Sequence, residues 1–210
     1  MMKKFVPAVV AAIVGLPLAF GSISPASAQD ASGARVNVRG TIADFTGDVL
    51  VVDTREGETA DIALSDGWMV SSVASAEISD IKPGDYVGIA SVPMEAGGDG
   101  ALEVLIFPAA MKGTGEGSFG WDLQPNSTMT NATVADAVTE VDGATVTVSY
   151  HGQDKKIAIP EGTPVVTFAS ATEDDLKPGA TVFVIAQEAG DGSLSTQQVV
   201  VGTNGVVPPM

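Results

Sequence analysis

The sequence predicts an all-β protein that consists of two tandem small β-barrels of OB-like character, and two observations predict this class. The first is composition: 24 glycines and 12 prolines accompany only 17% charged and 5% aromatic residues, and the apolar residues are mostly valine, isoleucine and alanine. This mixture is typical of short strands separated by tight turns. The second observation is an internal repeat, because residues 80–90 read DIKPGDYVGIA and residues 175–186 read DLKPGATVFVIA.

The repeat covers most of the chain. Five blocks recur in the same order at offsets between 92 and 96 residues, a pattern that indicates duplication rather than chance. The blocks are GTIAD (40–44) with ATVAD (132–136), VLVV (49–52) with TVTV (145–148), IAL (62–64) with IAI (157–159), the two KPG segments with the strand after each, and GDGALE (98–103) with GDGSLS (190–195). The domains predicted from these blocks are a barrel repeat at 36–107, a packed Gly-rich connector at 108–129, a second barrel repeat at 130–203 and a tail at 204–210.

Each copy is expected to form a meander of three strands, a short fourth strand and a final hairpin. In the first copy the first four strands are expected near 36–44, 49–53, 59–64 and 68–72, and the second copy follows the same plan. The Pro of each Lys-Pro-Gly unit presets φ, and the Gly accepts the positive φ of a type II turn. Each unit should therefore reverse the chain and begin a buried strand, at Tyr86 in one copy and at Thr181 in the other.

Closure of the sheet is predicted from its edges. A lone five-stranded sheet would leave one face and two edges in water, whereas curling it into a barrel buries the face and removes most of the edge. We therefore expect one barrel from each repeat. The alternative is a single two-sheet β-sandwich assembled from both repeats.

The first 28 residues predict export. A positive start at Lys3 and Lys4 precedes an apolar run over 5–20 and the small residues Ala26, Ser27 and Ala28, the order of a cleavable signal peptide. The run is shorter than the roughly 20 apolar residues that a membrane-spanning helix needs. We expect cleavage near Ala28, a periplasmic or secreted protein, and no membrane span in the mature chain.

Charge and cysteine content exclude several classes of function. The chain has a formal net charge of −16, and cleavage after Ala28 would leave 8 basic against 26 acidic residues, a net charge of −18. Nucleic acids and anionic membrane surfaces require clusters of Lys and Arg, so neither is an expected partner. The chain has no cysteine, which excludes disulfides and thiolate metal sites. A cationic partner or a divalent metal ion remains compatible with the charge.

The connector carries the candidate binding residues. Phe119, Trp121 and Leu123 alternate within its glycines, and such side chains are costly to leave in water, so we expect the segment to pack against the barrels. Trp121 beside Asp122 would form a recognition spot for a peptide, a sugar or a cationic ligand, and Glu116 in the same segment is a third candidate. The alternative is that Trp121 simply fills the core.

Metal binding is predicted only weakly. The single histidine, His151, falls in a predicted turn, so a zinc or copper centre is not expected. Calcium or another divalent cation needs only oxygen ligands, and the candidate residues are Asp99, Asp191, Asp174 and Asp175. None has the spacing of an EF-hand, and Asp beside Gly is the ordinary chemistry of a hairpin turn.

The order of these motifs resembles a family of exported bacterial domains of unknown function, small β-barrels that often occur in tandem. A Gly-Thr-Ile opening strand, D-[IL]-K-P-G and a G-D-G-x-L hairpin carry the resemblance over 36–107 and 130–203. Some relatives are labelled as metal-transport components. We expect a non-catalytic binding or scaffolding protein of the cell envelope, with an envelope protein or a small ligand as partner. The alternatives are an accessory periplasmic divalent-cation binder linked to metal transport and, third, an undetected hydrolase.

Overall fold

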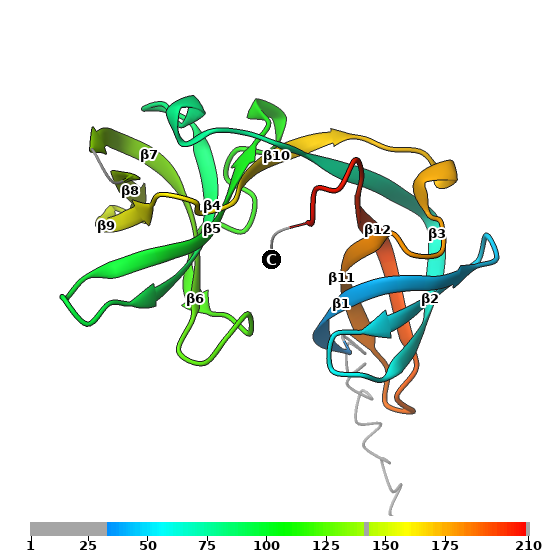
Figure 1. Ribbon diagram of the computed structural model, residues 1–210. Coiled ribbons are helices and arrows are strands. Elements are labelled where there is room, and N and C mark those ends of the chain that lie inside the picture. The colour runs from blue at the N-terminus through cyan, green and yellow to red at the C-terminus, as the bar shows by residue number, and fades with distance from the viewer. Residues whose placement is uncertain (1–32, 141–142, 209–210) are drawn as a thin grey trace, which may run out of the picture. The chain divides into compact units, whose positions relative to one another are not determined.

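The computed structural model describes residues 33–140 and 143–208 (Figure 1). The fold described here is that of the compact unit Ser32–Met210. The expected signal peptide and its cleavage point at Ala28 lie outside the described residues. Within the described ranges, the elements are strands and three short 3-10 turns, and no helix has the length and apolar character needed to cross a bilayer.

The elements follow one another in chain order as β1 (Ala34–Phe45), β2 (Val49–Thr54), β3 (Thr59–Ser75), η1 (Ile78–Asp80), β4 (Tyr86–Pro93), β5 (Asp99–Phe107), η2 (Ala109–Met111), β6 (Gly117–Gly120), β7 (Thr128–Glu140), β8 (Gly143–Tyr150), β9 (Gln153–Pro160), β10 (Val165–Ser170), η3 (Glu173–Asp175), β11 (Thr181–Glu188) and β12 (Leu194–Gly202). The all-β class predicted from composition and repeat is confirmed. Both Lys-Pro-Gly units end in a Gly of positive φ, Gly84 at 94° and Gly179 at 89°, as a type II turn requires.

The strands close into two small rings. In the first barrel, β1 pairs with β2 and β11, β2 with β3, β11 with β12, and a parallel β12–β3 pairing closes the ring. In the second barrel, β4 pairs with β5 and β7, β7 with β8, β8 with β9, and a short parallel β5–β9 pairing closes the ring. Each ring encloses its own apolar core, with Leu50, Ile62 and Val184 in the first and Ile89, Val146 and Ile157 in the second.

The strands are distributed between the barrels differently from the sequence-based expectation. We expected each repeat to close its own barrel, but the first barrel takes β1–β3 from the first repeat and β11–β12 from the second. The second barrel takes β4–β5 from the first repeat and β7–β9 from the second. The boundaries 36–107 and 130–203 therefore delimit the sequence repeats and not the barrels, which have exchanged strands.

The exchange lets the two crossing segments pair with each other in the antiparallel β3–β10 ladder, which closure within each repeat would not form, and β3 itself also differs from the expectation. We expected a third strand at 59–64 and a separate fourth strand at 68–72, but Thr59–Ser75 is one continuous strand. Gly67, with φ of 75°, sits at a shift in the pairing of β3 with β12, which has the character of a β-bulge and bends the strand without ending it. In both repeats the chain then crosses to the other barrel, through the second half of β3 in one and through β10 in the other. In the second repeat the equivalent strands, β9 and β10, stay separate, and Pro160 ends β9 while Pro164 directly precedes β10.

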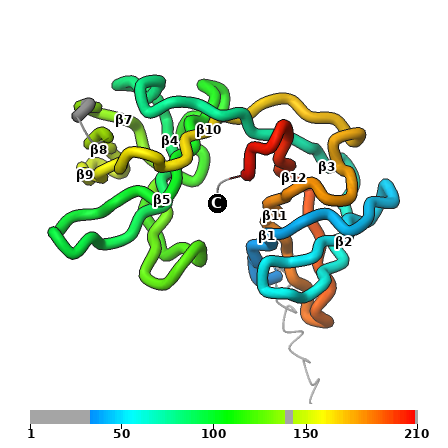
Figure 2. Tube along the Cα trace, in the orientation of Figure 1, coloured from blue at the N-terminus to red at the C-terminus, as the bar shows by residue number. Residues whose placement is uncertain are grey.

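The two barrels are related by a pseudo-two-fold axis. In the first barrel Val184 faces Val199, and in the second barrel Ile89 faces Val104. Ile89 lies 95 positions before Val184, and Val104 lies 95 positions before Val199. The crossing strands β3 and β10 run side by side between the barrels (Figure 2). Because identical registers recur in both rings, the chain is an intramolecular counterpart of a strand-swapped dimer.

The axis passes through the antiparallel ladder between β3 and β10. Val73 faces Phe168 there, and these two residues are themselves 95 positions apart. Their neighbours obey the same symmetry, since Ser75 faces Val166 and Ser71 faces Ser170. The centre of the molecule is therefore self-complementary, as at an isologous interface.

The exchange of strands predicts how the chain behaves when it is cut. A protease recognition sequence inserted after Gly113, an exposed position between η2 and β6, would allow the two repeats to be separated covalently. We expect the two fragments to stay together at the mass of the intact chain in native size-exclusion chromatography, because each apolar core contains strands from both fragments.

The control is the same cleaved sample in denaturant, which should resolve into two fragments. Fragments that elute separately under native conditions would contradict the exchange and support one barrel per repeat.

Candidate ligand-binding cleft

A cavity of about 480 Å³ lies between the outer faces of the two barrels. Its aromatic lining residues are Phe107, Phe119, Trp121, Phe168 and Phe183. Its polar or charged lining residues are Arg35, Asn37, Glu103, Thr114, Asn131 and Gln198. Most of the remaining wall is aliphatic or sulfur-containing, including Leu105, Met111 and Met129. This combination of size, apolar lining and a few polar groups is that of small-molecule sites in proteins.

Strand alternation explains why these residues face the cavity. On β5, Val104 is fully buried in the core of the second barrel, so Glu103 and Leu105 on either side of it point outward. On β12, Val199 lies in the core of the first barrel, and Gln198 and Val200 point outward in the same way. The cleft is thus formed by two outer sheet faces that meet across the pseudo-two-fold axis.

The two copies differ where they line the cleft. Phe183 on β11 corresponds to Gly88 on β4, 95 positions earlier, so a large ring on one wall is replaced by no side chain on the other. A Cβ on Gly88 would stand 2.9 Å from Oδ1 of Asn131 and 3.1 Å from the ring of Phe107. The cavity is therefore asymmetric, and Gly88 keeps the wall of the second barrel open.

The connector forms one wall of the cleft and touches both barrels. Its strand β6 pairs with β7 of the second barrel. The ring of Trp121 lies 6.1 Å from that of Phe119 and 6.4 Å from that of Phe183 in the first barrel. The guanidinium of Arg39 lies 5.5 Å from the Trp121 ring centroid and 5.0 Å from that of Phe183, within the range of cation–π attraction.

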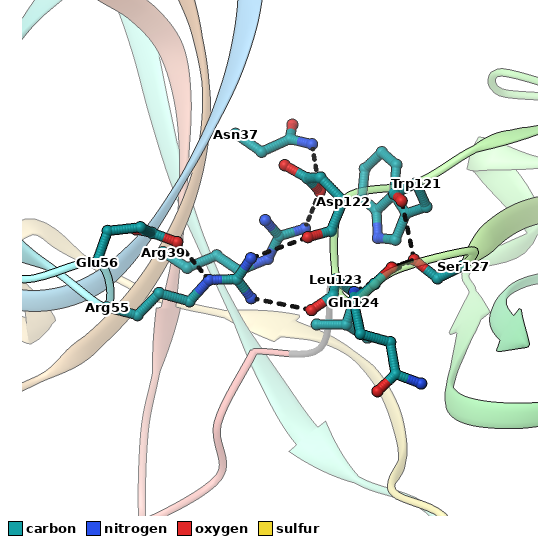
Figure 3. Close-up of polar contacts among 9 residues, drawn as sticks. All are labelled: Asn37, Arg39, Arg55, Glu56, Trp121, Asp122, Leu123, Gln124 and Ser127. Carbon is teal, nitrogen blue, oxygen red and sulfur yellow. Dashed lines mark hydrogen bonds and ion pairs between the residues drawn. The ribbon is translucent and has the colours of Figure 1, made fainter.

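Polar contacts fasten the connector to the first barrel (Figure 3). Oδ1 of Asp122 accepts hydrogen bonds from Arg39 at 2.8 Å and from Nδ2 of Asn37 at 3.0 Å. Arg55 donates to the backbone carbonyl of Asp122 at 2.9 Å and reaches that of Leu123 at 3.5 Å. Ser127 closes the loop by donating to the Trp121 carbonyl at 2.8 Å. We call Arg39, Arg55, Asn37 and Asp122 the arginine latch.

The latch shifts the ionisation of its acid. Burial alone raises the pKa of the Asp122 carboxyl, but the hydrogen bonds from Arg39 and Asn37 and the charge of Arg39 outweigh burial. The pKa of Asp122 therefore lies below its usual value. The carboxylate is the form that the latch stabilises.

The structure brings two of the three predicted binding residues together. Trp121 lines the cleft, and Asp122 lines a shallow hollow beside it together with Arg35 and Asn37. The indole Nε1 of Trp121 is buried and has no hydrogen-bond partner among the described residues, which is uncommon for a buried donor. Glu116 lies elsewhere, since its Oε1 accepts a hydrogen bond from the backbone N–H of His151 at 2.9 Å.

Glu116 instead acts on a neighbouring tyrosine. Burial, with a smaller effect from the negative charge of Glu116, raises the pKa of Tyr86 to about 12. The Tyr86 hydroxyl donates to the backbone carbonyl of Thr114 at 3.0 Å and so anchors the connector to the second barrel. Glu116 and Tyr86 therefore hold the connector in place and do not line the cleft.

The weak metal candidates lie in three separate places, at the start of β5, in the turn before β12 and in η3. Asp99 forms an ion pair with Lys155 at 2.9 Å, and Asp191 accepts hydrogen bonds from the backbone and hydroxyl of Ser193. Asp174 and Asp175 share η3, where Asp175 caps its own turn by accepting from Thr172. Within 33–140 and 143–208, no three acidic or histidine side chains gather into a metal-binding group. Asp99 thus serves an ion pair, and Asp175 and Asp191 serve turns.

Sequence reasoning missed most of the cleft. No sequence motif marks Gly88, Glu103 or Phe183, because each is an outward-facing residue in the middle of a strand. Arg35 also went unnoticed, although all three arginines of the chain, residues 35, 39 and 55, lie in the cleft or the latch. Comparing the two copies at outward positions would have identified Gly88 and Phe183 as a pair that differs.

The latch predicts a pH-dependent contribution to stability. Asp122→Asn removes the ion pair with Arg39, and we expect a loss of about 1 kcal/mol or less at neutral pH, because the Asp122 side chain is 51% exposed. A carboxyl with a depressed folded pKa stabilises above its unfolded value, near 3.9, and this stabilisation is lost as pH falls through the folded pKa. Urea unfolding of both proteins at neutral pH and near pH 3 measures the difference.

Asp174→Asn, which removes an exposed carboxylate in η3, is the matched control. If the difference in unfolding free energy between Asp122→Asn and the wild type were the same near pH 3 as at neutral pH, the latch would not depend on the charge of Asp122.

Comparison with known proteins gives no relative to this chain: no family model, no curated protein and no solved structure matches it.

Proposed function

We propose that this protein is an exported, non-catalytic binding protein of the bacterial cell envelope that holds a small apolar ligand in the cleft between its barrels. The observation that supports the proposal best is the cavity itself, about 480 Å³ in volume and lined by five aromatic side chains. Cavities of roughly 300–1,000 Å³ with such linings typically enclose small ligands. Export is supported by the signal-like order of residues 1–28.

Binding is favoured over catalysis by the chemistry of the lining. A hydrolytic site needs a nucleophile or water beside a general base, with a group that orients the base. The polar lining of the cleft consists of three amides, one hydroxyl, one arginine and one carboxylate. The single histidine, His151, sits in the turn between β8 and β9 and does not line the cleft.

The apolar lining also explains why the cleft would attract a ligand. Ile185 and Phe119 line it and are each 43% exposed, so apolar surface reaches the solvent at its mouth. Exposed apolar patches beside a cavity commonly mark binding grooves. A ligand with an apolar body would remove this surface from water.

An uncharged apolar dye, N-phenylnaphthylamine, tests the proposal. We expect saturable fluorescence enhancement with the wild-type protein. Gly88→Leu fills the cavity from the second barrel, and Ile185→Trp narrows it from the first. Each variant should weaken binding by about tenfold or more, because burying one apolar ring or side chain is worth roughly 1.5–3 kcal/mol.

Val138→Trp is the matched control for Ile185→Trp, because Val138 is an exposed apolar residue outside the cleft. Circular dichroism and thermal unfolding verify that each variant folds. The proposal fails if the wild type shows no saturable binding, or if both narrowed variants fold normally and bind the dye as the wild type does.

A further inference from the structure

Resting on the proposed binding function, we infer that the ligand of the cleft is a small monocarboxylate with an apolar body, and that Arg35 receives its carboxylate. This inference concerns the charge of the ligand, which the apolar lining alone leaves open. It follows from the placement of positive charge around the cleft.

The arginines of this acidic chain gather at one place. The formal net charge is −16, yet all three arginines line the cleft or belong to the latch beside it. None of the lysines in the described ranges lines the cavity. Arg39 is paired with Asp122 and Arg55 with Glu56, so among the described residues Arg35 is the arginine of this region that no carboxylate neutralises, and an anionic ligand would supply that charge.

The three arginines have different roles. Arg39 and Arg55 hold the connector through Asp122 and the backbone carbonyls of Asp122 and Leu123. Arg35 lines both the cleft and the shallow hollow beside it, and its side chain makes no hydrogen bond or ion pair with any residue of the described ranges. Its guanidinium is thus available to a ligand.

The strand geometry places Arg35 at the mouth of the cleft. Val36 and Val38 of β1 face the core of the first barrel, so Arg35 and Asn37 share the outward face. Asn37 lies opposite Ile185 in the β1–β11 ladder, which puts exposed apolar surface next to the guanidinium. A ligand with its apolar body among the rings would therefore present its polar end to Arg35.

A carboxylate matches this arrangement better than a cation does. The guanidinium is a planar fork that binds a carboxylate through two parallel hydrogen bonds. The faces of Trp121 and Phe183, which could otherwise attract a cationic ligand, already lie against the guanidinium of Arg39. Glu103, the one acid in the lining, is only 9% exposed, whereas Arg35 is exposed at the surface.

Isothermal titration calorimetry with three probes of one shape tests the inference: naphthoate, its uncharged amide naphthamide, and naphthylmethylammonium. We expect naphthoate to bind about tenfold or more tighter than naphthamide, the ratio that a charge-assisted hydrogen-bonded pair provides, and the ammonium to bind more weakly than naphthamide. Decanoate distinguishes a chain-shaped from a ring-shaped apolar body.

Arg35→Gln should remove the preference for naphthoate while leaving the affinity for naphthamide unchanged. Lys177→Gln, which removes the same charge from the turn after η3, is the matched control and should keep the preference.

The inference is overturned if the ammonium binds tightest, if naphthamide equals naphthoate, or if the preference survives Arg35→Gln. It is also overturned if N-phenylnaphthylamine binds but no carboxylate probe does. Each of these outcomes contradicts the carboxylate inference alone and leaves the proposed binding function standing. If N-phenylnaphthylamine does not bind either, the binding function itself fails.

Discussion

The exchange of strands between the two repeats is the constraint on which the rest of the structure depends. The meander β1–β3 presents Leu50 and Ile62 on one face, and that face is buried only when Val184 and Val199 of β11 and β12 close the ring. The second barrel is completed by β4 and β5 of the first repeat in the same way. Neither half of the chain can bury its apolar face alone, so the apolar cores themselves join the two barrels.

This coupling is what makes a preformed cleft possible. Two barrels joined by a flexible tether would leave the distance between their outer faces free. Here two crossing strands pair with each other through Val73 and Phe168, and Phe168 also lines the cavity. The connector adds a third tie through Trp121 and the arginine latch. Most of the cleft wall is thus positioned by strands, and the connector completes it.

Divergence between the two copies makes the proposed binding site asymmetric, so that it would take one ligand rather than two. A symmetric pair of outer faces would offer the same groups twice, but the copies differ at Gly88 and Phe183 and at Glu103 and Gln198, each pair 95 positions apart. The connector occurs once and covers one side of the symmetric arrangement. Substitutions at outward positions leave the packing of the two cores unchanged, because the neighbouring inward residues of each strand form those cores.

The sequence by itself determined the strands, the turns and the duplication, because these depend on local causes. The Pro and Gly of each Lys-Pro-Gly unit restrict φ whatever surrounds them, and alternation of valine and isoleucine marks strands at short range. The packing of Trp121 at the cleft also follows from a local pattern of apolar residues among glycines. These features could be predicted without knowing how any strand pairs.

Only the tertiary structure decided which repeat closes which barrel. Closure within a repeat and exchange between repeats would use equivalent side chains in the same registers, so the core residues are compatible with both. The difference lies in the antiparallel ladder between the second half of β3 and β10, which forms only when both segments cross to the other barrel. The candidate site depends on that choice, because Arg35, Gly88 and Phe183 come from distant segments and meet only when the barrels share their strands.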